Sequence, residues 1–158
     1  MWNERREPVK RTKQRGAAAV ELALVLPLLL ALIFGIVQFG WLINNYLVLT
    51  NAASLGAHQL AAERGYASPY SDATAAIHSQ TGALNGTLTI SMSVGGTSCT
   101  SDSACASALG SSTSAPAAGT QAKVQLGYTF APLFGGTLDN LKGIMPRSLS
   151  ATMSEVVQ

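Results

Sequence analysis

An unbroken apolar run near the N-terminus constrains the fold of this chain more than any other sequence feature. Residues 17–37 are all apolar, Gly or Pro except for Glu21. About 20 such residues cross the hydrocarbon core of a membrane as a helix. A cleaved secretory signal has a shorter apolar region, of about 7–15 residues, followed closely by a small-residue cleavage site. Here the run continues directly into further helical sequence, so we predict a retained transmembrane segment over residues 17–43.

Charge is distributed unevenly on the two sides of this run. Residues 1–16 contain six basic and two acidic residues, whereas the rest of the chain contains four basic and six acidic ones. Basic residues beside a span keep their flank in the cytoplasm. We therefore expect an inner-membrane protein with a cytoplasmic N-terminus and an extracytoplasmic C-terminal domain. The alternative, a basic arm that binds nucleic acid, is disfavoured because the rest of the chain offers no second basic surface.

The helix is expected to continue beyond the membrane as an amphipathic extension over residues 44–64. Arg64 and Gly65 provide a stop signal, with a cation in the last turn and a glycine just after it. Pro27 should bend the membrane-spanning part, because proline removes one backbone hydrogen bond and clashes with the preceding turn. Apolar residues recur at steps of three and four along one face, which is typical of a helix packed on a core: Leu42, Tyr46, Leu49, Ala53, Gly56 and Leu60. The other faces are assigned to Asn44, Asn45, Asn51, Ser54, His58 and Gln59.

Residues 65–158 are predicted to form a small α+β head. Alternating apolar and polar residues indicate half-buried strands at residues 87–94, 121–130 and 147–158, and a short helix is expected at residues 72–80. Residues 95–120 are rich in Ser, Thr, Gly and Ala and are interpreted as a long surface loop. The expected fold class is therefore α+β, with the amphipathic half of the long helix packed on an antiparallel sheet of about three strands.

Two cysteines, Cys99 and Cys105, lie within this Ser-rich stretch. In an exported chain we expect them to close a small disulfide loop, and two free thiols remain the alternative. No zinc site is expected, because two cysteines alone cannot complete one and the histidines His58 and His78 are isolated. No cofactor, small-molecule substrate or catalytic motif is indicated, so we expect a protein that is not an enzyme. An anchored envelope enzyme that uses the Ser-rich loop is the rival interpretation.

Glu21 is the residue in the span with the strongest claim to a function. An ionisable residue inside a membrane helix is costly and is by default a functional candidate. It follows Gly16 and Ala17 in the stretch RGAAAVEL, and it lies one helical turn after Ala17. If the chain were cut after Gly16, Glu21 of one helix would lie at the depth of a neighbouring helix's new α-amino group, and the pair would set the register of the two subunits. The alternative is a boundary residue that reaches the lipid headgroups.

These residues resemble the leader of a type IV prepilin: basic residues, a glycine, small residues, a glutamate in the fifth mature position and a long apolar helix. The longer run RGAAAVELALVLPLLLALIFGIVQFG, the following LTNAASLGAHQLA and the C-terminal VQLGYTFAPLF and LSATMSEVV are similar to the TadE-like pseudopilins of tight-adherence (Flp-type) pilus systems. The resemblance is close over residues 15–64 and looser over residues 121–157.

The resemblance implies that a prepilin peptidase removes residues 1–16 by cutting between Gly16 and Ala17. It also implies that Glu21 registers the mature subunit against other pilin-like subunits and the pilus assembly platform. The expected function is therefore that of a minor pilin-like structural subunit. The alternative is an uncleaved, signal-anchored envelope protein whose small binding domain is unrelated to pili.

Overall fold

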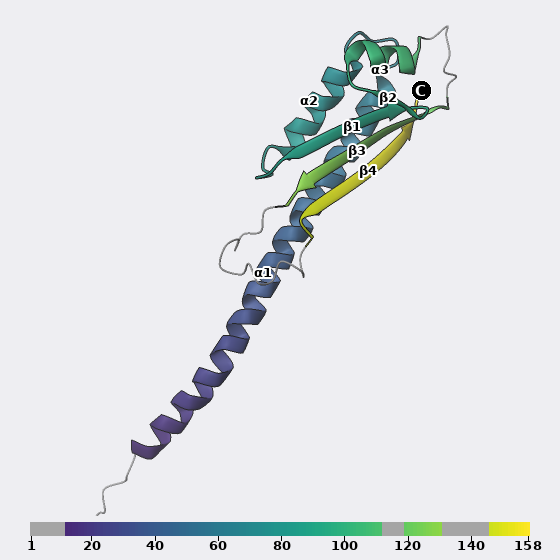
Figure 1. Ribbon diagram of the computed structural model, residues 1–158. Helices are drawn as coiled ribbons and strands as arrows, with labels where there is room; N and C mark the ends of the chain where they lie inside the picture. Colours follow the sequence, from purple (N-terminus) through teal and green to yellow (C-terminus); the bar gives the residue numbers. More distant parts are fainter. Residues whose placement is uncertain (1–11, 112–118, 131–145) are drawn as a thin grey trace, which may run out of the picture. The chain divides into compact units, whose positions relative to one another are not determined.

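The computed structural model describes residues 12–111, 119–130 and 146–158, with side chains in the first helix from residue 16 onward. Most of the predicted basic leader lies outside the described residues. The chain divides into two compact units, Met1–Phe39 and Gly40–Gln158. The described elements follow one another in this order (Figure 1): α1 (Thr12–Ala62), α2 (Pro69–Thr81), β1 (Leu88–Val94), β2 (Thr97–Cys99), α3 (Asp102–Leu109), β3 (Gln121–Thr129) and β4 (Ser148–Val156).

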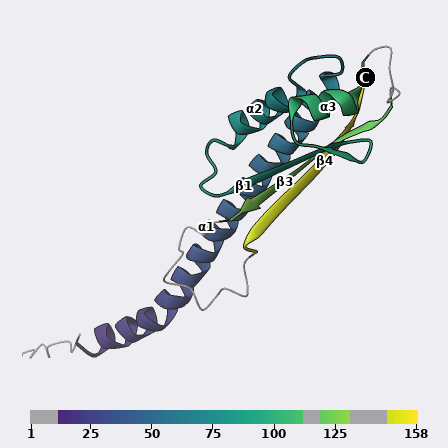
Figure 2. The same ribbon diagram turned by 45° about the horizontal axis from the view of Figure 1, so that its top comes forward.

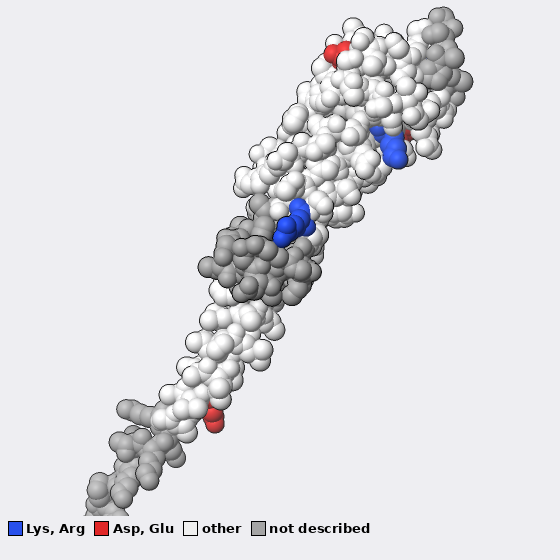
Figure 3. All heavy atoms as spheres, in the orientation of Figure 1, with Lys and Arg blue, Asp and Glu red and all other residues white. Residues whose placement is uncertain are grey.

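The described part of the first unit is the N-terminal portion of α1. The most apolar stretch of this helix has a mean hydropathy of 2.7, and none of it is buried within the protein. Leu24 and Leu28 are 75% and 73% exposed, and the surface here is almost free of charged side chains (Figure 3). A helix that is apolar on all sides and uncovered by protein fits a membrane interior. The helix continues through Pro27, where the bend stays a prediction.

In the second unit, the C-terminal portion of α1 supplies one side of the core. Leu49, Ala53, Gly56 and Leu60 are buried, as the predicted apolar stripe requires. The predicted stripe is wrong at Tyr46, which is 47% exposed, and at Asn45, which was assigned to another face and is 1% exposed. Leu42, at the start of the stripe, packs against the core as predicted. Asn45 lies four residues before Leu49 and continues the same face, whereas Tyr46 faces away from the core. The burial of Asn45 and the exposure of Tyr46 therefore follow from their positions around the helix and not from the polarity of their side chains.

The end of α1 and the short helix after it lie close to their predicted positions, but Arg64 follows the end of α1 and is not in its last turn as predicted. α1 ends at Ala62, and Gly65 adopts a positive φ of 82° that favours glycine. The next helix, α2, begins with Pro69 in its first turn, a position where the missing N–H of proline costs nothing. It buries Ala73 and Ile77 against the core.

The sheet contains four antiparallel strands in the order β2-β1-β3-β4, one more than the three predicted. The additional strand β2 and the helix α3 both fall within residues 95–120, so the prediction of a long surface loop there is wrong over residues 97–109. Composition misled the prediction, because small polar residues are common in loops. The few apolar side chains of this segment are nevertheless buried: Cys99, Cys105 and Leu109.

All three helices of the second unit cover the same face of the sheet (Figures 1 and 2). The alternation of β3 shows this most clearly, since Ala122, Val124, Leu126 and Tyr128 are buried and the residues between them are not. The opposite face is exposed and consists largely of Ser, Thr and Gln side chains. A one-sided antiparallel sheet of this kind is the α+β architecture that the strand patterns predicted.

Candidate processing and assembly site

The predicted processing residues Gly16 and Ala17 both lie in the first turns of α1. Both are exposed, and a Cβ added to Gly16 would meet nothing within 4 Å. The same is true of Gly35 and Gly40 farther along the helix. The described structure therefore gives no packing reason for a glycine at position 16. Glycine is about 1 kcal/mol less favourable than alanine inside a helix, so Gly16 makes this turn easier to unwind.

Glu21 lies on the same helix, four residues after Ala17, which corresponds to a rise of about 6 Å. Its side chain is exposed, and its carboxylate has no hydrogen bond or ion pair with any residue that the structure describes. Within α1 from Gly16 to Ala62 it is the sole charged residue. In hydrocarbon, an unpaired carboxylate costs about 2.5–3.5 kcal/mol at the centre of a helix and less near its ends. The isolated chain therefore presents an acid that needs a partner from outside its described part.

Cys99 and Cys105 are joined by a disulfide, with their Cα atoms 4.9 Å apart. Cys99 ends β2 and Cys105 lies in α3, so the bond connects the edge strand of the sheet to the helix that covers it. Both cysteines are almost completely buried. The histidines do not join a metal cluster in the described part of the chain, where no three His, Cys, Asp or Glu side chains converge, and both His58 and His78 are exposed.

A contact between α2 and α3 was not anticipated from the sequence. The Asp102 carboxylate accepts hydrogen bonds from the backbone N–H and the hydroxyl of Ser71, at 2.8 Å and 3.0–3.1 Å. The backbone hydrogen bond from Ser71 is the main reason why the pKa of Asp102 is lowered from its ordinary value of 3.8. Asp102 thus satisfies a free N–H group in the first turn of α2. In the sequence, Asp102 is recognisable only as an acidic residue at the start of a short helix, and this does not show that Ser71 is its partner.

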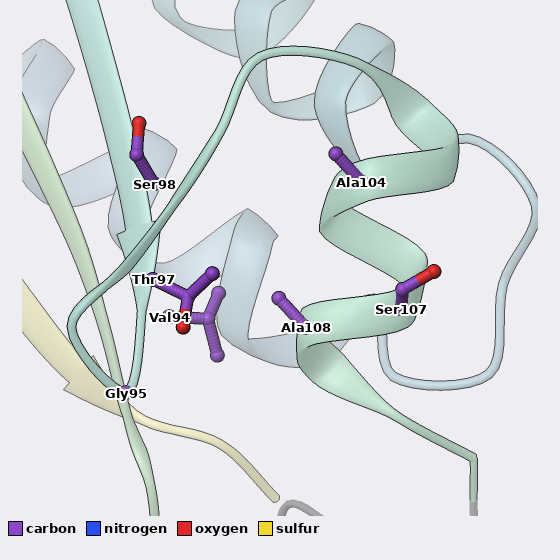
Figure 4. Close-up of a pocket in the computed structure, with 7 residues that line it drawn as sticks. All are labelled: Val94, Gly95, Thr97, Ser98, Ala104, Ser107 and Ala108. Carbon is purple, nitrogen blue, oxygen red and sulfur yellow. The ribbon is translucent and has the colours of Figure 1, made fainter.

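Two features at opposite edges of the sheet were also not predicted. At the β4 edge, nine residues form a strand with a neighbour on one side only. At the β2 edge, a hollow of about 510 Å³ lies between α3 and the β1–β2 hairpin (Figure 4). Small side chains line this hollow, and none of them is charged: Val94, Gly95, Thr97, Ser98, Ala104, Ser107 and Ala108.

The family model described as TadE-like protein matches residues 16–58. The resemblance seen in the sequence is therefore confirmed over this segment. The match begins at Gly16, includes Ala17 and Glu21, and extends into the part of α1 that packs on the sheet. No curated protein matches the chain, and no solved structure matches it.

Proposed function

We propose that this chain, TadE-like over residues 16–58, is a minor pilin-like subunit that acts in the assembly of a tight-adherence pilus. A prepilin peptidase cuts it after Gly16, residues 17–43 anchor it in the inner membrane, and the head lies outside the cytoplasm. The family match and the apolar helix support the membrane and pilus parts of this proposal. The proposed role is structural and requires no catalysis by the chain itself.

The proposed orientation agrees with two independent features. The six basic residues before Ala17 favour a cytoplasmic N-terminus. The disulfide between Cys99 and Cys105 suits an oxidising compartment, as expected for a head that has crossed the inner membrane.

Cleavage after Gly16 would change the chemistry of the helix start. It converts the nitrogen of Ala17 into a free α-amino group, which carries a positive charge when it is protonated. The carboxylate of Glu21 and the ammonium of Ala17 in a neighbouring subunit then carry opposite charges at one depth. At low dielectric constant each charge alone is penalised, whereas the pair is stabilised only when the two helices are in register.

The observation that carries this proposal is the isolation of Glu21. It is exposed and unpaired within the described structure, it is the single charge between Gly16 and Ala62, and it lies one turn from the proposed new terminus. A boundary residue that only reaches the headgroups would not need this distance from Ala17.

The test compares Glu21→Gln with Asp72→Asn, which removes an exposed carboxylate of α2 in the head instead. Glu21→Gln should leave membrane insertion equal or better, because a neutral side chain enters hydrocarbon more easily. It should also leave cleavage intact and greatly reduce co-isolation with the other pilus subunits. The Asp72→Asn control should co-isolate normally. Undiminished co-isolation of the Glu21→Gln protein would contradict the registering role.

A double variant separates the amine from the acid. Gly16→Val should block cleavage without disturbing the described packing, because an added Cβ there meets no described residue within 4 Å. In this uncleaved background Ala17 has no ammonium, so adding Glu21→Gln should cause no further loss of assembly. An additional loss of the same size as in the cleaved protein would show that Glu21 acts through some other partner.

A further inference from the structure

We propose that the heads of neighbouring copies join side by side, with the β4 edge of one copy paired to the β2 edge of the next. This inference rests on the proposed membrane anchoring and does not depend on cleavage after Gly16. The partner it names is a second copy of this chain in the same orientation.

The β4 edge has the features of a strand that is open to pairing. Arg147 accepts a backbone hydrogen bond from Phe130, and Val157 donates one to Thr120. Because bonded positions alternate in an antiparallel pair, the odd-numbered residues of β4 bond to β3 and the even-numbered ones direct their N–H and C=O groups outward. Within the described part of the chain these outward groups have no partner. They belong to exposed residues: Ser148, Ser150, Thr152, Ser154 and Val156.

The strand also lacks the usual protection against edge pairing. Proteins block exposed edges with proline, lysine, bulges or very short strands. β4 is nine residues long and contains neither proline nor lysine, and its one charged residue, Glu155, is next to its last position. An unprotected edge of this length is a template for another strand.

Membrane anchoring excludes the simplest partner, which is β4 of a second copy. Two such strands related by a two-fold axis would run antiparallel and would turn one head upside down relative to the other. The head begins at Gly40, directly after the proposed membrane anchor, so in two copies in one membrane the Gly40 end of each head is the end connected to the membrane. A copy in the same orientation presents its other edge strand, β2. Successive strands of the sheet are all antiparallel, so β2 runs opposite to β4, as antiparallel pairing requires.

The two edges also complement each other on the face that the helices cover. There, Leu149 and Met153 of β4 are only partly buried at the border of the core. At the opposite edge the hollow between α3 and the β1–β2 hairpin opens beside β2, and Ala104 and Ala108 point into it (Figure 4). A copy placed edge to edge brings the β4 side chains of this face toward the hollow. β2 has only three residues, so this contact and the high effective concentration of two anchored heads must supplement the backbone pairing.

The experiment is photo-crosslinking of the full-length chain in its native membrane. p-Benzoylphenylalanine replaces Thr152 at the β4 edge, and the matched control replaces Gln125. Gln125 is the exposed cross-strand neighbour of Thr152 on the central strand β3. We expect a dimer from the Thr152 position whose crosslinked peptide comes from residues 95–109 of the second copy, and no such dimer from Gln125.

Each other outcome counts against the inference. A crosslink between two β4 peptides would show the two-fold arrangement, and an adduct with a different protein would show that the edge serves another partner. Absence of any adduct at Thr152 would show that the edge stays unpaired.

A second pair of variants tests the hollow while keeping the β4 edge intact. Ala108→Trp fills it and should lower the dimer yield roughly tenfold. Ser103→Trp places the same side chain on an exposed part of α3 that does not line the hollow, and it should leave the yield unchanged. Equal yields from both variants would contradict seating in the hollow. The mass of the mature N-terminus is measured in the same sample, so loss of the dimer with normal cleavage rejects this inference alone.

Discussion

Gly56 lies where α1 packs closely on Ile77 of α2, and its replacement by alanine is a demanding test of this packing. A Cβ added there would lie 2.6 Å from both Cδ1 and Cγ1 of Ile77 in α2, and 3.7 Å from a methyl group of Val124 in β3. Contacts of 2.6 Å between carbon atoms are well inside their normal separation of about 3.5–4.0 Å. The side chain of Ile77 must therefore move, or α1 and α2 must separate.

Two opposing effects determine the size of the change. Replacing glycine by alanine inside a helix is worth about 1 kcal/mol in favour of folding, whereas overpacking a core costs about 1–3 kcal/mol. Ile77 is completely buried, and its branched Cβ restricts its rotamers. Both clashing atoms belong to it, and Cγ1 is not a free end. The cost should lie in the upper part of its range, so we expect Gly56→Ala to destabilise the head by about 1–2 kcal/mol.

The assay is denaturant unfolding of the full-length protein in detergent, followed by near-ultraviolet circular dichroism of the head. Gly40→Ala is the matched control, because an added Cβ there meets no described residue within 4 Å. It should leave stability unchanged or raise it by up to about 1 kcal/mol. In a Gly56→Ala and Ile77→Ala double variant, the combined loss should be smaller than the sum of the single losses, since the second change removes the clashing atoms. If Gly56→Ala were as stabilising as Gly40→Ala, the proposed packing of α1 against α2 would be refuted.

Three further predictions concern the head. Gly86→Ala should destabilise it by about 1–3 kcal/mol, because the new Cβ would clash with the Thr129 carbonyl oxygen and would lie 2.7 Å from the ring of Tyr128; an unchanged unfolding midpoint would contradict this. Asp102→Ala should lower the stability of the head at neutral pH. Because the pKa of Asp102 is lowered in the folded state, the stability difference from the parent should persist above pH 3.8 and vanish as the pH falls through the folded pKa. A stability difference that grows on acidification would contradict this prediction. Replacing both cysteines by alanine should cost roughly 2 kcal/mol through the lost loop closure, measured as a shift in the denaturant midpoint, and unaltered stability would show that the disulfide is dispensable.

Most of the secondary structure could be predicted because burial on one side creates a period. The strand patterns at residues 87–94, 121–130 and 147–158 correspond to β1, β3 and β4 within one or two residues at each end. The long helix and its end near Arg64 were equally clear. In each case, alternation or helical spacing reports directly on which face meets the core.

The segment around the cysteines shows where this reasoning fails. β2 has only three residues and α3 only eight, so neither is long enough to show a period. Their small polar side chains suggest a loop, although the disulfide and the contact between Asp102 and Ser71 hold the segment against the rest of the head. These interactions join residues that are distant in the chain or depend on three-dimensional geometry, and single-residue propensities do not contain them.

The candidate site also contains features that the sequence could predict and features that it could not. The leader pattern could be read from Gly16, Ala17 and Glu21 alone, because one helical turn fixes their spacing. The open edge of β4 and the hollow beside β2 could not be read, since both depend on the order of strands in the sheet. A sequence that predicts three strands does not show which of them lie at the edges.

The most direct measurement of the central claim is the intact mass of the mature protein, isolated from the membrane of cells with an active prepilin peptidase. The proposed function predicts a chain that begins at Ala17, with a free or modified α-amino group opposite Glu21 of a neighbour. A protein that keeps Met1 and the basic leader, or one that begins at another residue, would contradict it.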